Sequence, residues 1–143
     1  MKMKKILLME DHAPQAMELV QQLEALNYEA VWARDATEAL EHLGKSDFDA
    51  VVADIFVREG DALKADGGVT LIGKIRKAAL KIKVGKGYRK MPVIAISGGF
   101  DVSGRENFLS DTVFGIGADA ALPKPVDMEK LSSLVETMTG ESG

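Results

Sequence analysis

The sequence predicts an α/β domain built around a parallel β-sheet. Short apolar runs, of the kind found in buried strands, alternate along the chain with segments whose apolar residues recur at helical spacing. This alternation is typical of strand–helix–strand units, in which helices cover both faces of a parallel sheet. The length of 143 residues suits one domain that buries a sizeable core. We therefore expect a single domain over residues 1–139 and a flexible tail over 140–143.

Five segments have the character of strands. Three are nearly continuous apolar runs, as expected of central strands buried on both faces, and they cover residues 5–9, 48–53 and 92–96. Residues 28–34 are typical of a strand nearer the edge of the sheet, and residues 119–122 are a short fifth candidate.

Helical spacing predicts five helices between and after these strands. The first covers 14–26, with Pro14 at a position where proline is favoured. The last covers 127–138 and has Asp127 as its expected N-cap. The others cover 37–43, 68–80 and about 105–114.

Composition narrows the possible functions. With no cysteine in the chain, disulfide and thiolate chemistry are excluded, and a reducing cytoplasm is the expected location. A net charge of −4 gives no general attraction to nucleic acid. No apolar segment approaches the roughly 20 residues that span a membrane. We therefore expect neither nucleic acid nor membrane as a direct partner.

Polar residues that could bind a ligand or take part in a reaction follow the predicted strands. They are Glu10 and Asp11 after the first strand, Asp54 after the third, Ser97 after the fourth and Lys124 after the fifth. Doubly wound sheets bind ligands at the carboxyl ends of their strands. If the strand order is flavodoxin-like, 2-1-3-4-5, three carboxylates converge there. Carboxylates that lie close together raise one another's pKa unless a cation offsets their charge. Mg²⁺ is suited to this role because it prefers oxygen ligands. The pattern predicts a divalent metal site.

Four segments of the chain resemble the signature segments of response-regulator receiver domains, in family order. They are Leu-Leu-Met-Glu10-Asp11, Asp49-Ala-Val-Val-Ala-Asp54, Val-Ile-Ala-Ile-Ser97-Gly98 and Leu-Pro-Lys124-Pro125. The resemblance implies a flavodoxin-like (βα)5 fold, a doubly wound parallel sheet with strand order 2-1-3-4-5. It also implies a single-domain response regulator of a two-component or phosphorelay pathway.

The resemblance assigns a role to each polar residue. Asp54 would take a phosphoryl group from a phosphohistidine and form an acyl phosphate. Glu10, Asp11, Asp54 and the backbone carbonyl of Ile55 would hold Mg²⁺ or Mn²⁺.

Two more residues would contact the phosphoryl group. Ser97 and Lys124 would each bind one of its oxygens, and the Lys124–Pro125 bond would be cis. The partners implied are a sensor histidine kinase or a histidine phosphotransfer protein, and a downstream protein target. Activity beyond metal-dependent self-phosphorylation and self-dephosphorylation is not expected.

Other interpretations stay open for these residues. Asp54, Glu10 or Asp11 alone could cap a turn or helix, and Ser97 and Lys124 could be ordinary polar residues. The chain could also be a pseudo-receiver, a binding module that keeps the fold without phosphorylation. Enzymes of similar fold fit less well. Flavodoxins need a hydroxyl- and glycine-rich loop after the first strand, and haloacid dehalogenases need an aspartate at the position of Phe56.

The chain departs from the family in three ways. Ala121 stands where many receivers have an aromatic switch residue, which leaves Phe100 or Phe108 as candidate partners for the loop after Ser97. Ser97-Gly98-Gly99 resembles a subset of stand-alone receivers. Residues 56–66 and 81–90 extend the usual length, and the second of these is either a mobile loop or a basic docking site.

Overall fold

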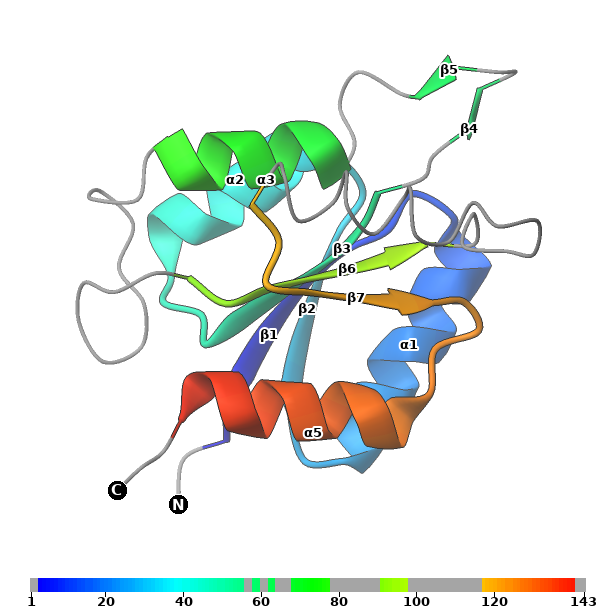
Figure 1. Ribbon diagram of the computed structural model, residues 1–143, viewed down its shortest axis with the longest axis vertical. Helices are drawn as coiled ribbons and strands as arrows, with labels where there is room; N and C mark the ends of the chain where they lie inside the picture. The colour runs from blue at the N-terminus through cyan, green and yellow to red at the C-terminus, as the bar shows by residue number, and fades with distance from the viewer. Residues whose placement is uncertain are drawn as a thin grey trace.

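A five-stranded parallel sheet forms the middle layer of the structure. Figure 1 shows the computed structural model, which describes residues 3–55, 58–59, 62–63, 68–77, 91–97 and 117–140. The strands are β1 (Lys5–Met9), β2 (Glu29–Ala33), β3 (Ala50–Asp54), β6 (Val93–Ser97) and β7 (Ala120–Pro123). They lie in the order β2-β1-β3-β6-β7, and each pair is parallel. The predicted order 2-1-3-4-5 is confirmed.

Four helices cover the sheet in the described part of the chain. They are α1 (Ala13–Ala25), α2 (Ala36–Lys45), α3 (Gly68–Lys77) and α5 (Met128–Thr139). Asp127 is the N-cap of α5, because its side chain accepts hydrogen bonds from the backbone N–H groups of Glu129 and Lys130. The same helix ends one residue later than predicted, and Gly140 caps it in the left-handed conformation.

Two apolar cores lie on the two faces of the sheet. Strand β3 contributes to both, since successive side chains of a strand point to opposite faces. Val51 and Ala53 pack in the core beneath α2 and α3, while Ala50 and Val52 pack in the core beneath α1 and α5. This explains the continuous apolar runs of the central strands. None of the described helices has the length and apolar character needed to cross a bilayer.

The segment 56–66 contains a feature that the sequence analysis missed. No strand was expected there, but β4 (Arg58–Glu59) and β5 (Ala62–Leu63) pair in an antiparallel sheet of their own. Strands of two residues are too short to show the alternation by which strands are recognised. The dipeptide Gly60-Asp61 between them was the available signal, because such pairs connect hairpin strands.

Several predictions from sequence lie outside the described residues. They concern the helix at about 105–114, the basic segment 81–90, the Gly98-Gly99 pair, and the candidate switch residues Phe100 and Phe108.

A charge cluster fixes the edge of the sheet at the amino ends of β6 and β7. Arg76 of α3 donates to the carbonyl oxygens of Gly117 (2.8 Å) and Met91 (2.9 Å) and to Asp119 Oδ2 (3.0 Å). The same Asp119 oxygen accepts from the Val93 N–H over 2.8 Å. Gly117 has φ +115°, and a Cβ there would lie 2.7 Å from Arg76 Cγ. We call Arg76, Asp119 and these backbone partners the Arg76 cluster.

Candidate functional site

Two of the residues expected to follow strands are instead the last residues of strands, whereas Glu10, Asp11 and Lys124 follow β1 and β7 as predicted. Asp54 is the last residue of β3, paired with Ile96, and Ser97 is the last residue of β6, paired with Pro123. Both strands therefore extend one residue beyond the predicted ends at 53 and 96. The reason is that backbone pairing continues past the last apolar side chain, which hydrophobic patterning does not reveal.

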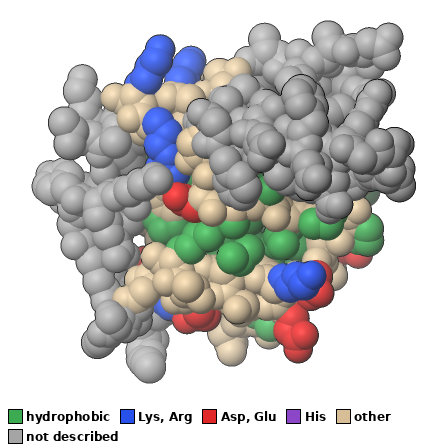
Figure 2. Space-filling view, viewed as in Figure 1, with side chains coloured by type: hydrophobic (Ala, Val, Ile, Leu, Met, Phe, Trp, Pro, Cys, Tyr) green, Lys and Arg blue, Asp and Glu red, His purple; other side chains and the backbone are tan. Residues whose placement is uncertain are grey.

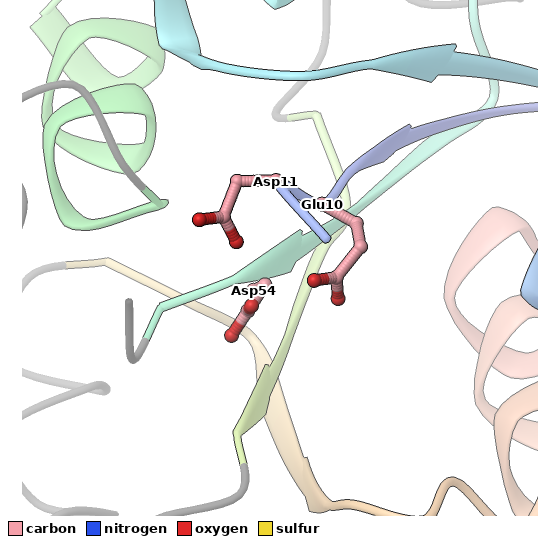
Figure 3. A group of neighbouring side chains, drawn as sticks. All are labelled: Glu10, Asp11 and Asp54. Carbon is pink, nitrogen blue, oxygen red and sulfur yellow. The ribbon is translucent and has the colours of Figure 1, made fainter. Parts of the chain in front are cut away.

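Three carboxylates converge at this edge. Glu10, Asp11 and Asp54 each offer an oxygen, and these oxygens lie within 4.8 Å of one another. In Figure 3 the Glu10 and Asp11 side chains leave the end of β1 in different directions, and their carboxylates stand with that of Asp54 around one space. Glu10 is 1% exposed and Asp54 3% exposed, whereas Asp11 is open to solvent. The predicted acidic cluster therefore exists, with an accessible side at Asp11.

Lys124 brings a positive charge to these three carboxylates, and we call the four residues together the pocket. Its Nζ donates to Glu10 Oε1 over 2.7 Å and to Asp54 Oδ2 over 3.1 Å. Burial by itself lowers the pKa of Lys124, but the hydrogen bond to Glu10 and the charges of Asp54 and Glu10 outweigh it, so that the pKa lies above its ordinary value. The ammonium group therefore stays charged at neutral pH. The Lys124–Pro125 bond is cis, as the resemblance implied.

Ser97 lies beside Lys124 at the end of the sheet. Ser97 is fully buried, and its backbone carbonyl accepts from the Lys124 N–H over 3.0 Å.

Ala121 of β7 is partly buried against the core beneath α2 and α3. Figure 2 shows apolar side chains gathered across the middle of the face that carries β7 and α5. The five polar residues singled out from sequence thus lie together at the carboxyl ends of the strands. They are Glu10, Asp11, Asp54, Ser97 and Lys124.

A comparison with known families fits this geometry. The family model described as the response regulator receiver domain matches residues 6–136. The chain belongs to the receiver domain family. It is therefore a domain of two-component signalling and not a classical enzyme. Comparison with curated protein sequences found no match.

Solved structures share the fold of this receiver domain. A protein described as a response regulator, from Chloroflexus aurantiacus J-10-fl, is 23% identical with a TM-score of 0.77, over 98% of this chain and 100% of that chain. A CheY-like receiver domain protein from Methanospirillum hungatei JF-1 is 25% identical with a TM-score of 0.70, over 96% and 94%. A response regulator from Burkholderia pseudomallei is 22% identical with a TM-score of 0.69, over 95% and 68%. Its crystal structure contains a phosphorylated aspartic acid, a calcium ion and citrate.

The donor set of this receiver domain fits a hard divalent cation. All three side chains are carboxylates, which are the ligands that Mg²⁺ and Ca²⁺ prefer, and within the described part of the chain no histidine joins the cluster. Mg²⁺ usually keeps several waters and takes only one or two carboxylates. The exposed side at Asp11 leaves room for such waters.

Gly68 lies close against the backbone at the end of β3. It is the first residue of α3, and a Cβ at this position would clash with the Asp54 carbonyl oxygen and lie 2.9 Å from Ile55 Cα. A side chain here would displace the end of β3. Close backbone approach therefore requires glycine. The sequence predicted the start of a helix at residue 68 but not this contact.

Two residues of the site were missed by the sequence analysis. The indole N–H of Trp32 donates to the Glu10 carbonyl oxygen over 2.8 Å, while the Glu10 N–H donates to the Ala33 carbonyl over 3.0 Å. Strand β2 thus fixes both backbone groups of Glu10. Gln15 of α1 accepts from Lys124 Nζ over 2.9 Å. No sequence pattern marks either residue, because each contact joins distant segments.

Proposed function

We propose that this receiver domain is a signalling phosphoacceptor whose acceptor is Asp54. The contact between Lys124 Nζ and Asp54 Oδ2 over 3.1 Å, inside a cluster of carboxylates, supports it best. The phosphorylated aspartate of the Burkholderia pseudomallei neighbour lends support by analogy. We take the domain to be the single unit over residues 1–139.

In the proposed reaction an oxygen of the Asp54 carboxylate attacks the phosphorus of a phosphohistidine. The new O–P bond replaces the P–N bond, and the released imidazole takes up a proton. Lys124 offsets negative charge on the transferring oxygens, and the Ser97 hydroxyl donates to another of them. Loss of the phosphoryl group to water reverses the signal.

Glu10, Asp11, Asp54 and the Ile55 backbone carbonyl are the proposed ligands of Mg²⁺ or Mn²⁺. Bound there, the ion supplies positive charge that offsets both the acceptor and the phosphoryl oxygens. The proposed donor is a sensor histidine kinase or a histidine phosphotransfer protein, and the response passes to a downstream protein.

Intact mass measurement tests this function. The wild type, incubated with acetyl phosphate and Mg²⁺, is expected to gain the mass of one phosphoryl group, and EDTA is expected to prevent the gain. Asp54→Asn should gain nothing, because an amide is a poor nucleophile.

Asp47→Asn is the matched control, since Asp47 is exposed and lies outside the acidic cluster. It should gain mass like the wild type. If the wild type gains no phosphoryl mass from acetyl phosphate or from a kinase, the pseudo-receiver interpretation replaces this proposal.

A further inference from the structure

Lys124 has an acceptor that lies outside the acidic cluster. A lysine ammonium group has three N–H donors, and the structure provides three acceptors for them. Two are the carboxylates of Glu10 and Asp54, and the third is Gln15 Oε1 at 2.9 Å. The contact to Gln15 is shorter than the contact to Asp54 at 3.1 Å. A neutral amide therefore shares the ammonium group with two charged groups.

The beginning of α1 places Gln15 for this contact. His12 is the N-cap of the helix, and its backbone N–H donates to Glu10 Oε2 over 3.2 Å. Glu10 therefore touches the start of α1 with one oxygen and Lys124 with the other. Gln15 follows in the first turn, and its residue is exposed, so no packing of an apolar core requires a glutamine there.

We propose that Gln15 is a positioning residue for Lys124, with its side-chain carbonyl holding the ammonium group on the α1 side of the pocket. Glu10 and Asp54 are also the groups proposed to bind a divalent cation. Without Gln15, the ammonium group keeps only two of its three acceptors, the carboxylates of Glu10 and Asp54. It then competes more strongly with the metal ion for the oxygens of these carboxylates. Gln15 thus limits the competition between the Lys124 ammonium group and the metal ion for the same oxygens. This inference rests on the proposed metal site.

The first test measures exchange of the Lys124 ammonium protons with water by ¹H–¹⁵N NMR, in the absence of any phosphodonor. Gln15→Met keeps the length and helix propensity of the side chain but removes the acceptor. The exchange is expected to become about fivefold faster, the factor that corresponds to one lost hydrogen bond. Gln15→Glu keeps an acceptor at the same length and should retain the slow exchange of the wild type.

The second test measures Mg²⁺ binding by titration calorimetry, again without phosphodonor. Gln15→Met is expected to raise the dissociation constant about threefold to fivefold, because the ammonium group competes harder. Gln22→Met is the matched control, since Gln22 is an exposed glutamine of the same helix two turns later. It should leave both readings unchanged.

The inference is overturned if Gln15→Met matches Gln22→Met in either ammonium exchange or Mg²⁺ affinity. Both readings come from the unphosphorylated protein. A wild type that binds Mg²⁺ but never gains phosphoryl mass would reject the proposed function and leave the result for Gln15 intact.

Discussion

Two charge clusters stand at opposite ends of the same sheet, and they are built in opposite ways. The Arg76 cluster joins one guanidinium to one carboxylate and two backbone carbonyls, at the amino ends of β6 and β7. The pocket at the carboxyl ends gathers three carboxylates, and two of them, Glu10 and Asp54, bind one ammonium group. Among the groups just named, the charges of the first cluster balance, whereas those of the second have an excess of negative charge. The balanced cluster serves the fold, and the unbalanced one is suited to bind a cation.

The largest effect is expected at the balanced cluster. Arg76→Ala should lower the free energy of unfolding by about 2 to 3 kcal/mol, because Asp119 and two carbonyls lose a charged donor in a partly buried setting. Urea denaturation measures it.

Arg34→Ala provides the comparison, since the Arg34 side chain is 68% exposed in its ion pair with Glu38. It should cost no more than about 0.5 kcal/mol. Equal losses for the two variants would mean that the Arg76 cluster adds nothing beyond an ordinary surface pair.

A substitution in the pocket should change the free energy of unfolding in the opposite direction. Asp11→Asn removes one negative charge and leaves the two carboxylates that bind Lys124. Without metal it is expected to raise the free energy of unfolding by about 1 kcal/mol, since it relieves repulsion between carboxylates. Added Mg²⁺ should stabilise this variant less than the wild type.

Urea denaturation in EDTA and in excess Mg²⁺ separates these two effects. Asp47→Asn should behave like the wild type in both conditions. If Asp11→Asn instead lowers stability in EDTA, the pocket carries no excess of negative charge and the contrast between the two edges fails.

Trp32 tests whether the edge strand β2 supports the pocket. Trp32→Phe keeps an aromatic ring but removes the donor to the Glu10 carbonyl oxygen. We expect it to lower the free energy of unfolding by about 1 kcal/mol and to weaken Mg²⁺ binding about threefold. Calorimetric titration with Mg²⁺ measures the second effect.

Val31→Ala is the control for lost packing on the same strand, since Val31 packs against the core beneath α2 and α3. It should lower stability without changing Mg²⁺ affinity. A Trp32→Phe variant with wild-type affinity would limit Trp32 to a packing role.

The smallest effect is expected far from both clusters, at Glu136. Hydrogen bonds from Lys4 and Tyr28 hold the pKa of Glu136 below its ordinary value of 4.5. A carboxyl whose pKa is lowered by folding contributes stability above its unfolded pKa and loses it as pH falls through the folded pKa. Glu136 is about half exposed in this pair, so the contribution is at most about 0.5 kcal/mol.

The difference in unfolding free energy between the wild type and Glu136→Gln should therefore shrink as pH falls from neutrality to below 4.5. Urea denaturation at a series of pH values measures it. A difference that grows on acidification would contradict the assigned shift.

The sheet could be predicted from sequence because its central strands bury both faces. Continuous apolar runs marked β1, β3 and β6, and the polar residues behind them marked the edge at which Glu10, Asp54 and Ser97 meet. The β4–β5 hairpin was not predicted, because two-residue strands show no periodicity. Element types were therefore readable from patterning, while short pairings were not.

The contacts of the site were less predictable than its members. The sequence indicated Lys124 and the three carboxylates, but not that Gln15 accepts from Lys124 or that Trp32 donates to the Glu10 backbone carbonyl. Arg76 likewise looked like one cation among several at the end of α3. Each of these side chains contacts residues at least 15 positions away, and a single sequence does not show which residues meet across such distances.

The site of phosphorylation tests the central claim most directly. Protein treated with acetyl phosphate and Mg²⁺ is reduced with borohydride, which converts an aspartyl phosphate to homoserine, and the peptides are sequenced by mass spectrometry. We expect homoserine at position 54 in the wild type and none after EDTA. Homoserine at another aspartate, with an unmodified Asp54, would contradict the proposal that the acidic cluster at the carboxyl ends of the strands is the phosphoacceptor site.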